Sequence, residues 1–262
     1  MQDRYAGDLG DYLKLGLLRW LAPPTAAFPR LGVIWYRTAD EAHNADGKHI
    51  AYLDPSHRLA ARLNQLDSDL YARLASIVNS GRRTTAALAS SGVLAAGTCF
   101  FGDLLDFADL PVGRAGWAAR QERRRSWIQR ALAATSGCDF IFADPDNGIR
   151  SSLHPVSAHR TKAVKHAYLA ELAAFAGRGQ SLIVYHHADR SAAVEQQARH
   201  RLTELGRDLP VSPLAAVRAS RGTTRLFLIG AATPAHADYL TGRLTSLAHS
   251  PWAEELQVYK PG

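Results

Sequence analysis

The fold of this chain is decided by one stretch, DFIFADPDNG at residues 139–148. Residues 140–143 are apolar without alternation, which is typical of a strand buried on both faces of a parallel sheet. Pro145 cannot continue a strand and Asn147-Gly148 is a turn signal, so the chain should leave the sheet here. Asp144 is therefore predicted at the carboxyl end of a central strand, where open α/β sheets bind their ligands. A plain polar turn is the alternative interpretation.

Composition narrows the class of protein. The 262 residues are 47% hydrophobic and 21% charged, which is typical of a globular protein with a substantial core. The formal net charge of +7 favours polyanionic partners such as nucleic acid. Two cysteines, Cys99 and Cys138, are too few for a disulfide framework or a zinc site. With no signal-like segment and no apolar run near ~18 residues, we expect a soluble cytoplasmic protein without a membrane partner.

Hydrophobic periodicity places the elements. Apolar residues recur at helical spacing in residues 8–21, 57–90, 120–135, 164–175, 194–205 and 233–247. Apolar runs predict strands at residues 31–36, 93–94, 98–101, 140–143, 181–185, 214–217 and 226–229. Alternating strands and helices predict a mostly parallel sheet covered on both faces, and the last two strands form an antiparallel hairpin. We therefore expect one Rossmann-like α/β domain over residues 1–262, like a class I methyltransferase sheet, with a helical insertion near residues 55–90.

Polar side chains gather just beyond the strand ends. They are Asp40, Glu41, Asp103, Asp144, Asp146, His186 and His187. Because the carboxyl ends of parallel strands meet at one edge, we expect these groups to lie near one another. The loop at residues 38–49 is the most polar in the chain, with His43, Asn44, Asp46, Gly47, Lys48 and His49. A connection of this length is usually functional.

Charged residues also cluster at two other places in the sequence. Asp11 and Lys14 stand three residues apart on the first helix, away from its apolar stripe, and can face a shared site. We expect the segment around Lys14 and the acidic turn after Ala143 to meet over one pocket. Residues 120–127 hold the densest basic cluster, which fits a solvated helix face as well as a phosphate contact.

A family resemblance rests on residues 5–14, YAGDLGDYLK. This stretch resembles the opening signature of the bacterial 23S ribosomal RNA adenine-N6 methyltransferases of the RlmJ type, with Ala6, Gly7, Asp11 and Lys14 in register. Asp144-Pro145 stands where that family has its catalytic Asp-Pro-Pro-Tyr, although Asp146-Asn147 replaces the Pro-Tyr. The loop after the first strand holds Gly47 in place of a glycine-rich turn.

The resemblance implies an RNA-modifying N-methyltransferase that uses S-adenosylmethionine. A carboxylate and a backbone carbonyl that accept hydrogen bonds from an amine would localise its lone pair for methyl transfer. The catalytic candidates are Asp144, Asp146, Asn147 and Lys14. The cofactor-binding candidates are Asp40, Glu41, Gly47 and Asp103. The substrate-binding candidates are Tyr5, Asp11, His186, Arg123 and Arg124.

Two other classes stay open. A metal-dependent nuclease or phosphohydrolase would use Mg, Mn or Zn, for which oxygen and imidazole ligands are suited. Its candidate ligands are Asp40, Glu41, His43, Asp46, Asp144, Asp146, His186 and His187. A non-catalytic RNA-binding protein would keep the sheet and its basic surface. The sequence leaves the oligomeric state open.

Overall fold

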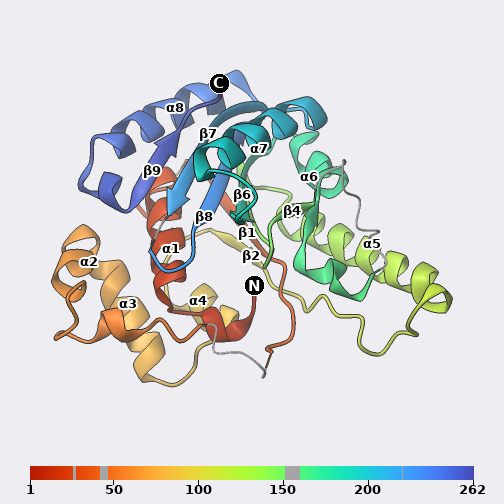
Figure 1. The fold of residues 1–262 in the computed structure, drawn as a ribbon, viewed down its shortest axis with the longest axis horizontal. Helices are drawn as coiled ribbons and strands as arrows, with labels where there is room; N and C mark the ends of the chain where they lie inside the picture. Colours follow the sequence, from red (N-terminus) through yellow and green to blue (C-terminus); the bar gives the residue numbers. More distant parts are fainter. Residues whose placement is uncertain (26–27, 42–46, 151–159, 220) are drawn as a thin grey trace.

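The computed structural model describes residues 1–25, 28–41, 47–150, 160–219 and 221–262. Its centre is a seven-stranded sheet in the order β2-β1-β3-β6-β8-β7-β9 (Figure 1). The strands are β1 (Leu31–Trp35), β2 (Cys99–Phe101), β3 (Phe140–Asp144), β6 (Ser181–His187), β7 (Ser212–Ala219), β8 (Arg225–Ala231) and β9 (Leu256–Tyr259). Two short strands, β4 (Ile149–Arg150) and β5 (Ala167–Tyr168), pair beside the main sheet.

Strand direction divides the sheet into two halves. β2, β1, β3 and β6 pair in parallel, whereas β8 is antiparallel to both β6 and β7, and β9 is antiparallel to β7. The predicted mostly parallel α/β sheet and the closing hairpin are therefore confirmed. β9 was not predicted from the sequence. Between β1 and β3 the strand order reverses, which is the position where doubly wound sheets have their ligand crevice.

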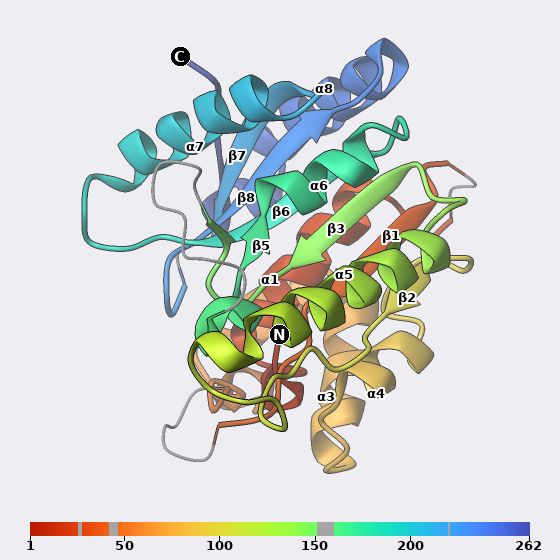
Figure 2. The ribbon, with the colours of Figure 1, turned by 90° about the vertical axis from the view of Figure 1, so that its right-hand side faces the viewer.

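Residues of β3 alternate between two cores, because successive side chains of a strand point to opposite faces. Phe140 and Phe142 pack with the apolar side chains of α1, whereas Ile141 and Ala143 pack with those of α5 and α6. One face is thus covered by α1 (Leu9–Leu21) and α8 (Pro234–Ala248), and the other by α5 (Trp117–Ala134), α6 (Leu169–Ala176) and α7 (Val194–Asp208). Figure 2 shows α5, α6 and α7 along the second face, with α1 behind the sheet.

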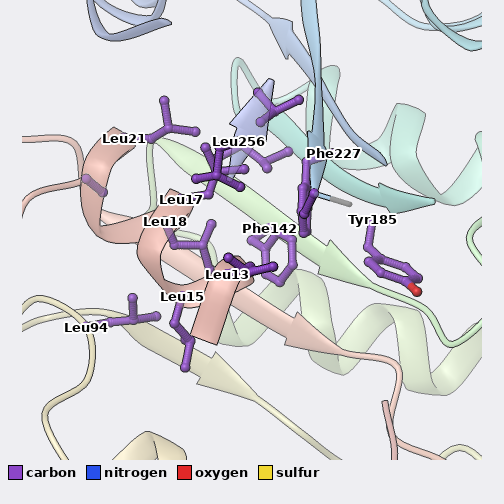
Figure 3. Close-up of a cluster of buried hydrophobic side chains, with 14 of the residues drawn as sticks. Leu13, Leu15, Leu17, Leu18, Leu21, Leu94, Phe142, Tyr185, Phe227 and Leu256 are labelled. Carbon is purple, nitrogen blue, oxygen red and sulfur yellow. The ribbon is translucent and has the colours of Figure 1, made fainter. Parts of the chain in front are cut away.

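Helix α1 is anchored by its leucines. Asp8 is its N-cap, with the side chain accepting a hydrogen bond from the backbone N–H of Asp11. Leu13, Leu17 and Leu21 are fully buried in the core cluster that also holds Phe142 and Phe227 (Figure 3). The predicted helix over residues 8–21 is confirmed. Its burial fixes the start of α1 at the carboxyl edge of β3.

The segment between β1 and β2 is helical, as predicted. It forms α2 (Ala60–Leu66), α3 (Ser68–Asn79) and α4 (Thr85–Ser90), and α3 packs against α1. The predicted strand at residues 93–94 is wrong. Val93 and Leu94 are buried core residues in the bend before β2, so their apolar character reflects packing and not a strand.

Three other boundaries differ from the prediction. α5 begins at Trp117, before the predicted residue 120. α6 begins at Leu169, because residues Thr161–Lys165 form a 3-10 turn and Ala167–Tyr168 form β5. β6 runs through His187, so both histidines belong to the strand itself. In the described residues, no helix has the length and apolar character needed to cross a membrane.

Candidate functional site

A cavity of ≈ 380 Å³ opens at the carboxyl edge of the sheet, on the face covered by α1. It is lined by Met1, Tyr5, Asp8, Gly10, Asp11, Lys14, Gly47, His49, Asp144, Pro145, Asp146, Asn147, Tyr185, His187, Thr223 and Arg225. These residues come from the N-terminal segment and α1, from the loop after β1, from the end of β3 and the turn after it, from the end of β6, and from the start of β8. A concave pocket with convergent polar groups at this edge is the default position of a ligand site in an open α/β sheet.

A buried ammonium group joins two carboxylates at the centre of the pocket. Lys14 Nζ donates to Asp144 Oδ2 at 2.7 Å and to Asp11 Oδ1 at 2.8 Å. All three side chains are at most 7% exposed, so little solvent screens the interaction. The segment around Lys14 and the turn after Ala143 therefore meet as expected, although 130 positions separate Lys14 from Asp144.

The pKa values of Asp11 and Lys14 are both raised, for different reasons. Burial raises the pKa of Asp11 to about 6, against the attraction of Lys14, and the nearby Asp8 carboxylate adds to the rise. Burial alone would lower the pKa of Lys14, but the carboxylates of Asp11 and Asp144 outweigh it and raise this pKa well above its ordinary value. Lys14 is therefore a permanent ammonium at the base of the pocket.

The crevice between β1 and β3 is filled by the first two residues. The Met1 amino group donates to the backbone oxygens of Tyr36 at 2.9 Å and Asp144 at 3.3 Å, and pairs with Asp146 at 2.7 Å. Gln2 Nε2 donates to Asp146 Oδ2 at 3.0 Å. Burial alone would raise the pKa of Asp146, but the Met1 ammonium and the Gln2 amide outweigh it and lower this pKa.

The turn after β3 needs its glycine. Gly148 has φ +91°, and a Cβ there would lie 2.4 Å from His186 Nδ1. The same ring nitrogen accepts a hydrogen bond from the Ile149 N–H at 3.2 Å. His186 therefore supports the turn from behind. Burial lowers its pKa to about 3, so it is a neutral acceptor.

The structure brings seven of the thirteen predicted catalytic, cofactor and substrate residues into the lining of this pocket. They are Tyr5, Asp11, Lys14, Gly47, Asp144, Asp146 and Asn147. His187, a candidate only for a metal, also lines it. Six predicted residues are not among the lining residues. They are Asp40, Glu41, Asp103, Arg123, Arg124 and His186.

Those six have other partners. Asp40 accepts from the Arg4 N–H, and Glu41 pairs with Lys165. Asp103 pairs with Arg130 at 2.8 Å on the surface. Each strand end in question lies at the correct edge, but the side chain is directed to a local partner and not to the pocket.

The predicted arginine cluster is held by carboxylates. Arg123 pairs with Asp109, and Arg124 is buried against Glu171. Arg124 Nη1 also donates to the Ala163 oxygen at 2.9 Å. These guanidinium groups stabilise contacts of α5 with neighbouring segments, which a charge run in the sequence does not reveal.

The described candidate ligands of the metal-dependent alternative do not form a cluster. In the described part of the chain, no three His, Cys, Asp or Glu side chains form a group that could hold a metal ion. His43 and Asp46 lie outside the described residues. Of the remaining candidates, Asp144, Asp146 and His187 line the pocket, but Lys14 and Met1 already occupy the two carboxylates.

Besides Asp8, the N-cap of α1, sequence reasoning missed one charged residue of the pocket, Arg225. It is the first residue of β8, an antiparallel strand that begins at the edge where β6 ends, and its register partner is His187. The signal was available, because the predicted strand at residues 226–229 closes an antiparallel hairpin. The residue that precedes such a strand lies at the same edge as the residues that come after parallel strands.

A comparison of the chain with protein-family models and with curated proteins finds no match. The fold and the pocket define the class: an α/β protein with a Lys-centred, aspartate-lined site at the carboxyl edge of its sheet. Function is therefore inferred from the geometry and chemistry of this pocket, together with the motifs that line it.

Proposed function

We propose that the chain is an enzyme that methylates an exocyclic amine of a nucleic-acid base, in RNA, with S-adenosylmethionine as the methyl donor. The observation that carries the proposal is the 2.7 Å contact between Lys14 and Asp144. It unites the YAGDLGDYLK stretch and the Asp-Pro turn, the two motifs that resemble the ribosomal RNA methyltransferases, at one pocket. The closing antiparallel hairpin of β7 and β8 also agrees with the class I methyltransferase-like sheet that the sequence predicts.

Asp144 has the environment that amine methylation requires. Its Oδ2 accepts from Lys14, and within the described residues no side chain or backbone group donates to its Oδ1. That oxygen is available to accept an N–H of the substrate amine and then its proton, while the Pro145 carbonyl at the pocket wall can accept the second N–H. Directed acceptors of this kind localise the nitrogen lone pair for attack.

The pocket suits the proposed cofactor. S-adenosylmethionine supplies an electrophilic methyl group on a cationic sulfonium. Asp8 and Asp11 provide carboxylates at the start of α1, and the rings of Tyr5 and Tyr185 provide the aromatic surface that stabilises cations. A cavity of ≈ 380 Å³ is in the range of small-molecule sites. Because Met1 and Gln2 fill the crevice between β1 and β3, the cofactor would be held beside α1 and not by Asp40, Glu41 or Asp103.

A cofactor-binding and transfer assay tests the proposal. Titration calorimetry should show S-adenosylmethionine binding to the wild-type chain at micromolar levels, and methyl-labelled cofactor should transfer label to a mixed pool of RNA. Asp144→Asn keeps the shape of the side chain and should lose at least about 100-fold in transfer, because one preorganised charged acceptor contributes about that much. Its cofactor affinity should change little.

The matched control is Asp103→Asn, whose carboxylate pairs with Arg130 outside the pocket. This variant should bind cofactor and transfer label as the wild type does. Absence of cofactor binding at millimolar concentration would contradict the proposal. RNA binding without cofactor binding would instead support a non-catalytic RNA-binding protein.

A further inference from the structure

Arg225 is a cation at the rim of the pocket without a carboxylate partner in the described part of the chain. Its Nη1 donates to two backbone oxygens of the β7–β8 connection, those of Thr223 at 2.9 Å and Arg221 at 3.3 Å. The guanidinium is thus positioned by the backbone while part of its donor fork stays unused. Arg221, by contrast, forms a bidentate pair with Glu255.

Helix α1 makes room for this guanidinium. Gly10 stands in the first turns of α1, where glycine is less favourable than alanine by up to about 1 kcal/mol. A Cβ at Gly10 would lie 2.5 Å from Arg225 Nη2 and 2.6 Å from its Cζ. The glycine of α8, Gly242, has nothing within 4 Å of a Cβ at that position. Gly10 therefore has a specific role, which is to let Arg225 lie against the start of α1.

The other cations of the pocket are already paired with carboxylates. Lys14 is shared by Asp11 and Asp144, and Asp146 pairs with the Met1 ammonium. The Asp8 side chain caps α1. The guanidinium at the start of β8 is therefore the positive charge that the pocket offers to a ligand.

A histidine lies beside it. His187 is the register partner of Arg225 across the β6–β8 pair, and paired residues of neighbouring strands point to the same side of the sheet. His187 Nδ1 is 3.3 Å from the Tyr185 hydroxyl. Burial raises the pKa of Tyr185 to about 12, so its hydroxyl keeps its proton and can donate to Nδ1. The strand register and Tyr185 thus hold the imidazole beside the guanidinium.

We propose that Arg225 is an oxyanion-binding subsite that positions the ligand in the pocket. A guanidinium fork matches the oxygens of phosphate and carboxylate, and such charge-assisted hydrogen bonds are about twice as strong as neutral ones. The inference rests on the proposed function for the identity of the ligand. Within it, the oxyanion is either the phosphate of the target nucleotide or the carboxylate of the cofactor.

Paired ligands that differ by one oxyanion test the subsite. Calorimetry on the full chain would compare adenosine 5′-monophosphate with adenosine, and S-adenosylmethionine with its decarboxylated form, which lacks only the carboxylate. The wild type should prefer the member that carries the oxyanion in at least one pair by about tenfold. Arg225→Gln should abolish that preference and leave the affinity for the member without the oxyanion unchanged. Arg199→Gln, which removes an exposed arginine paired with Glu195, should behave as the wild type.

Each outcome decides the inference. A preference lost only in the nucleotide pair assigns the subsite to phosphate, and one lost only in the cofactor pair assigns it to the carboxylate. A preference that survives Arg225→Gln, or equal binding of both members of each pair by the wild type, would overturn it. Because nucleotide binding is measured without methyl transfer, a subsite can be shown in a chain that fails the transfer assay. Conversely, an active transferase can fail this test.

Discussion

Two groups of basic side chains in this molecule differ in what holds them. The arginines of α5 are dense in the sequence, and four of them pair with carboxylates: Arg123 with Asp109, Arg124 with Glu171, Arg125 with Glu122, and Arg130 with Asp103. The cations of the pocket are far apart in the sequence. Lys14 is shared by two buried carboxylates, and Arg225 is held by backbone oxygens. Availability for a ligand is thus set by tertiary partners and not by the density of charge along the chain.

The largest effect on the free energy of unfolding is expected from Lys14→Met. Removing the ammonium leaves Asp11 and Asp144 buried without a counter-charge, so the free energy of unfolding at pH 8 should fall by about 4 kcal/mol. The loss should depend on pH in a defined direction. Burial already raises the pKa of Asp11 to about 6, and loss of Lys14 raises it further, above the unfolded value of about 3.9.

Between these pKa values the folded state binds the proton that the unfolded state releases, so the stability of Lys14→Met should rise as pH falls from about 8 to about 5. Urea unfolding at several pH values measures this. A loss of stability that is the same at both ends of this range would show that Asp11 does not take up the proton.

The next effect tests the α5 arginines. Arg124→Leu leaves Glu171 without its counter-charge and the oxygens of Ala163 and His166 without the Arg124 donor, which should cost about 3 kcal/mol of unfolding free energy. Arg123→Leu breaks an exposed pair and should cost less than about 1 kcal/mol. Urea unfolding of both variants, with nucleotide affinity as a second measurement, checks this. Reduced nucleotide affinity in either variant would show that these arginines contribute to ligand binding.

The smallest effect on stability, and the most selective one, is expected from two glycines. Gly10→Ala and Gly242→Ala should each raise the free energy of unfolding by less than about 1 kcal/mol through helix propensity. Only the first places a methyl group against the Arg225 guanidinium, whose flexible end can shift. Gly10→Ala should therefore weaken binding of adenosine 5′-monophosphate severalfold while Gly242→Ala leaves it unchanged. Equal affinities of the two variants for this nucleotide would show that Gly10 does not influence binding in the pocket.

Much of the architecture could be predicted because it depends on local patterns. The unalternating apolar run at residues 140–143 specifies a doubly buried strand, and the leucines of α1 specify a helix with one buried face. The contact between Lys14 and Asp144 could also be predicted. The parallel topology brings the first half of α1 and the carboxyl end of β3 to the same edge of the sheet.

The contacts that could not be predicted depend on partners that are distant in the sequence. Nothing local to Arg124 indicates Glu171, and nothing local to Asp103 indicates Arg130. Val93 and Leu94 are apolar because they pack in the core, and two apolar residues do not distinguish a bend from a strand. The filling of the crevice between β1 and β3 likewise depends on hydrogen bonds between segments that no periodicity connects.

The reversed strand β8 has a consequence for how this pocket could change over time. A parallel strand supplies this edge of the sheet with the residues at and beyond its carboxyl end. β8 runs the other way and supplies the edge with its first residue, Arg225. Insertions or deletions in residues 221–224 would therefore move the guanidinium across the rim while β1, β3 and β6 kept their register. Ligand preference at the rim and chemistry at the base of the pocket can in this way diverge independently.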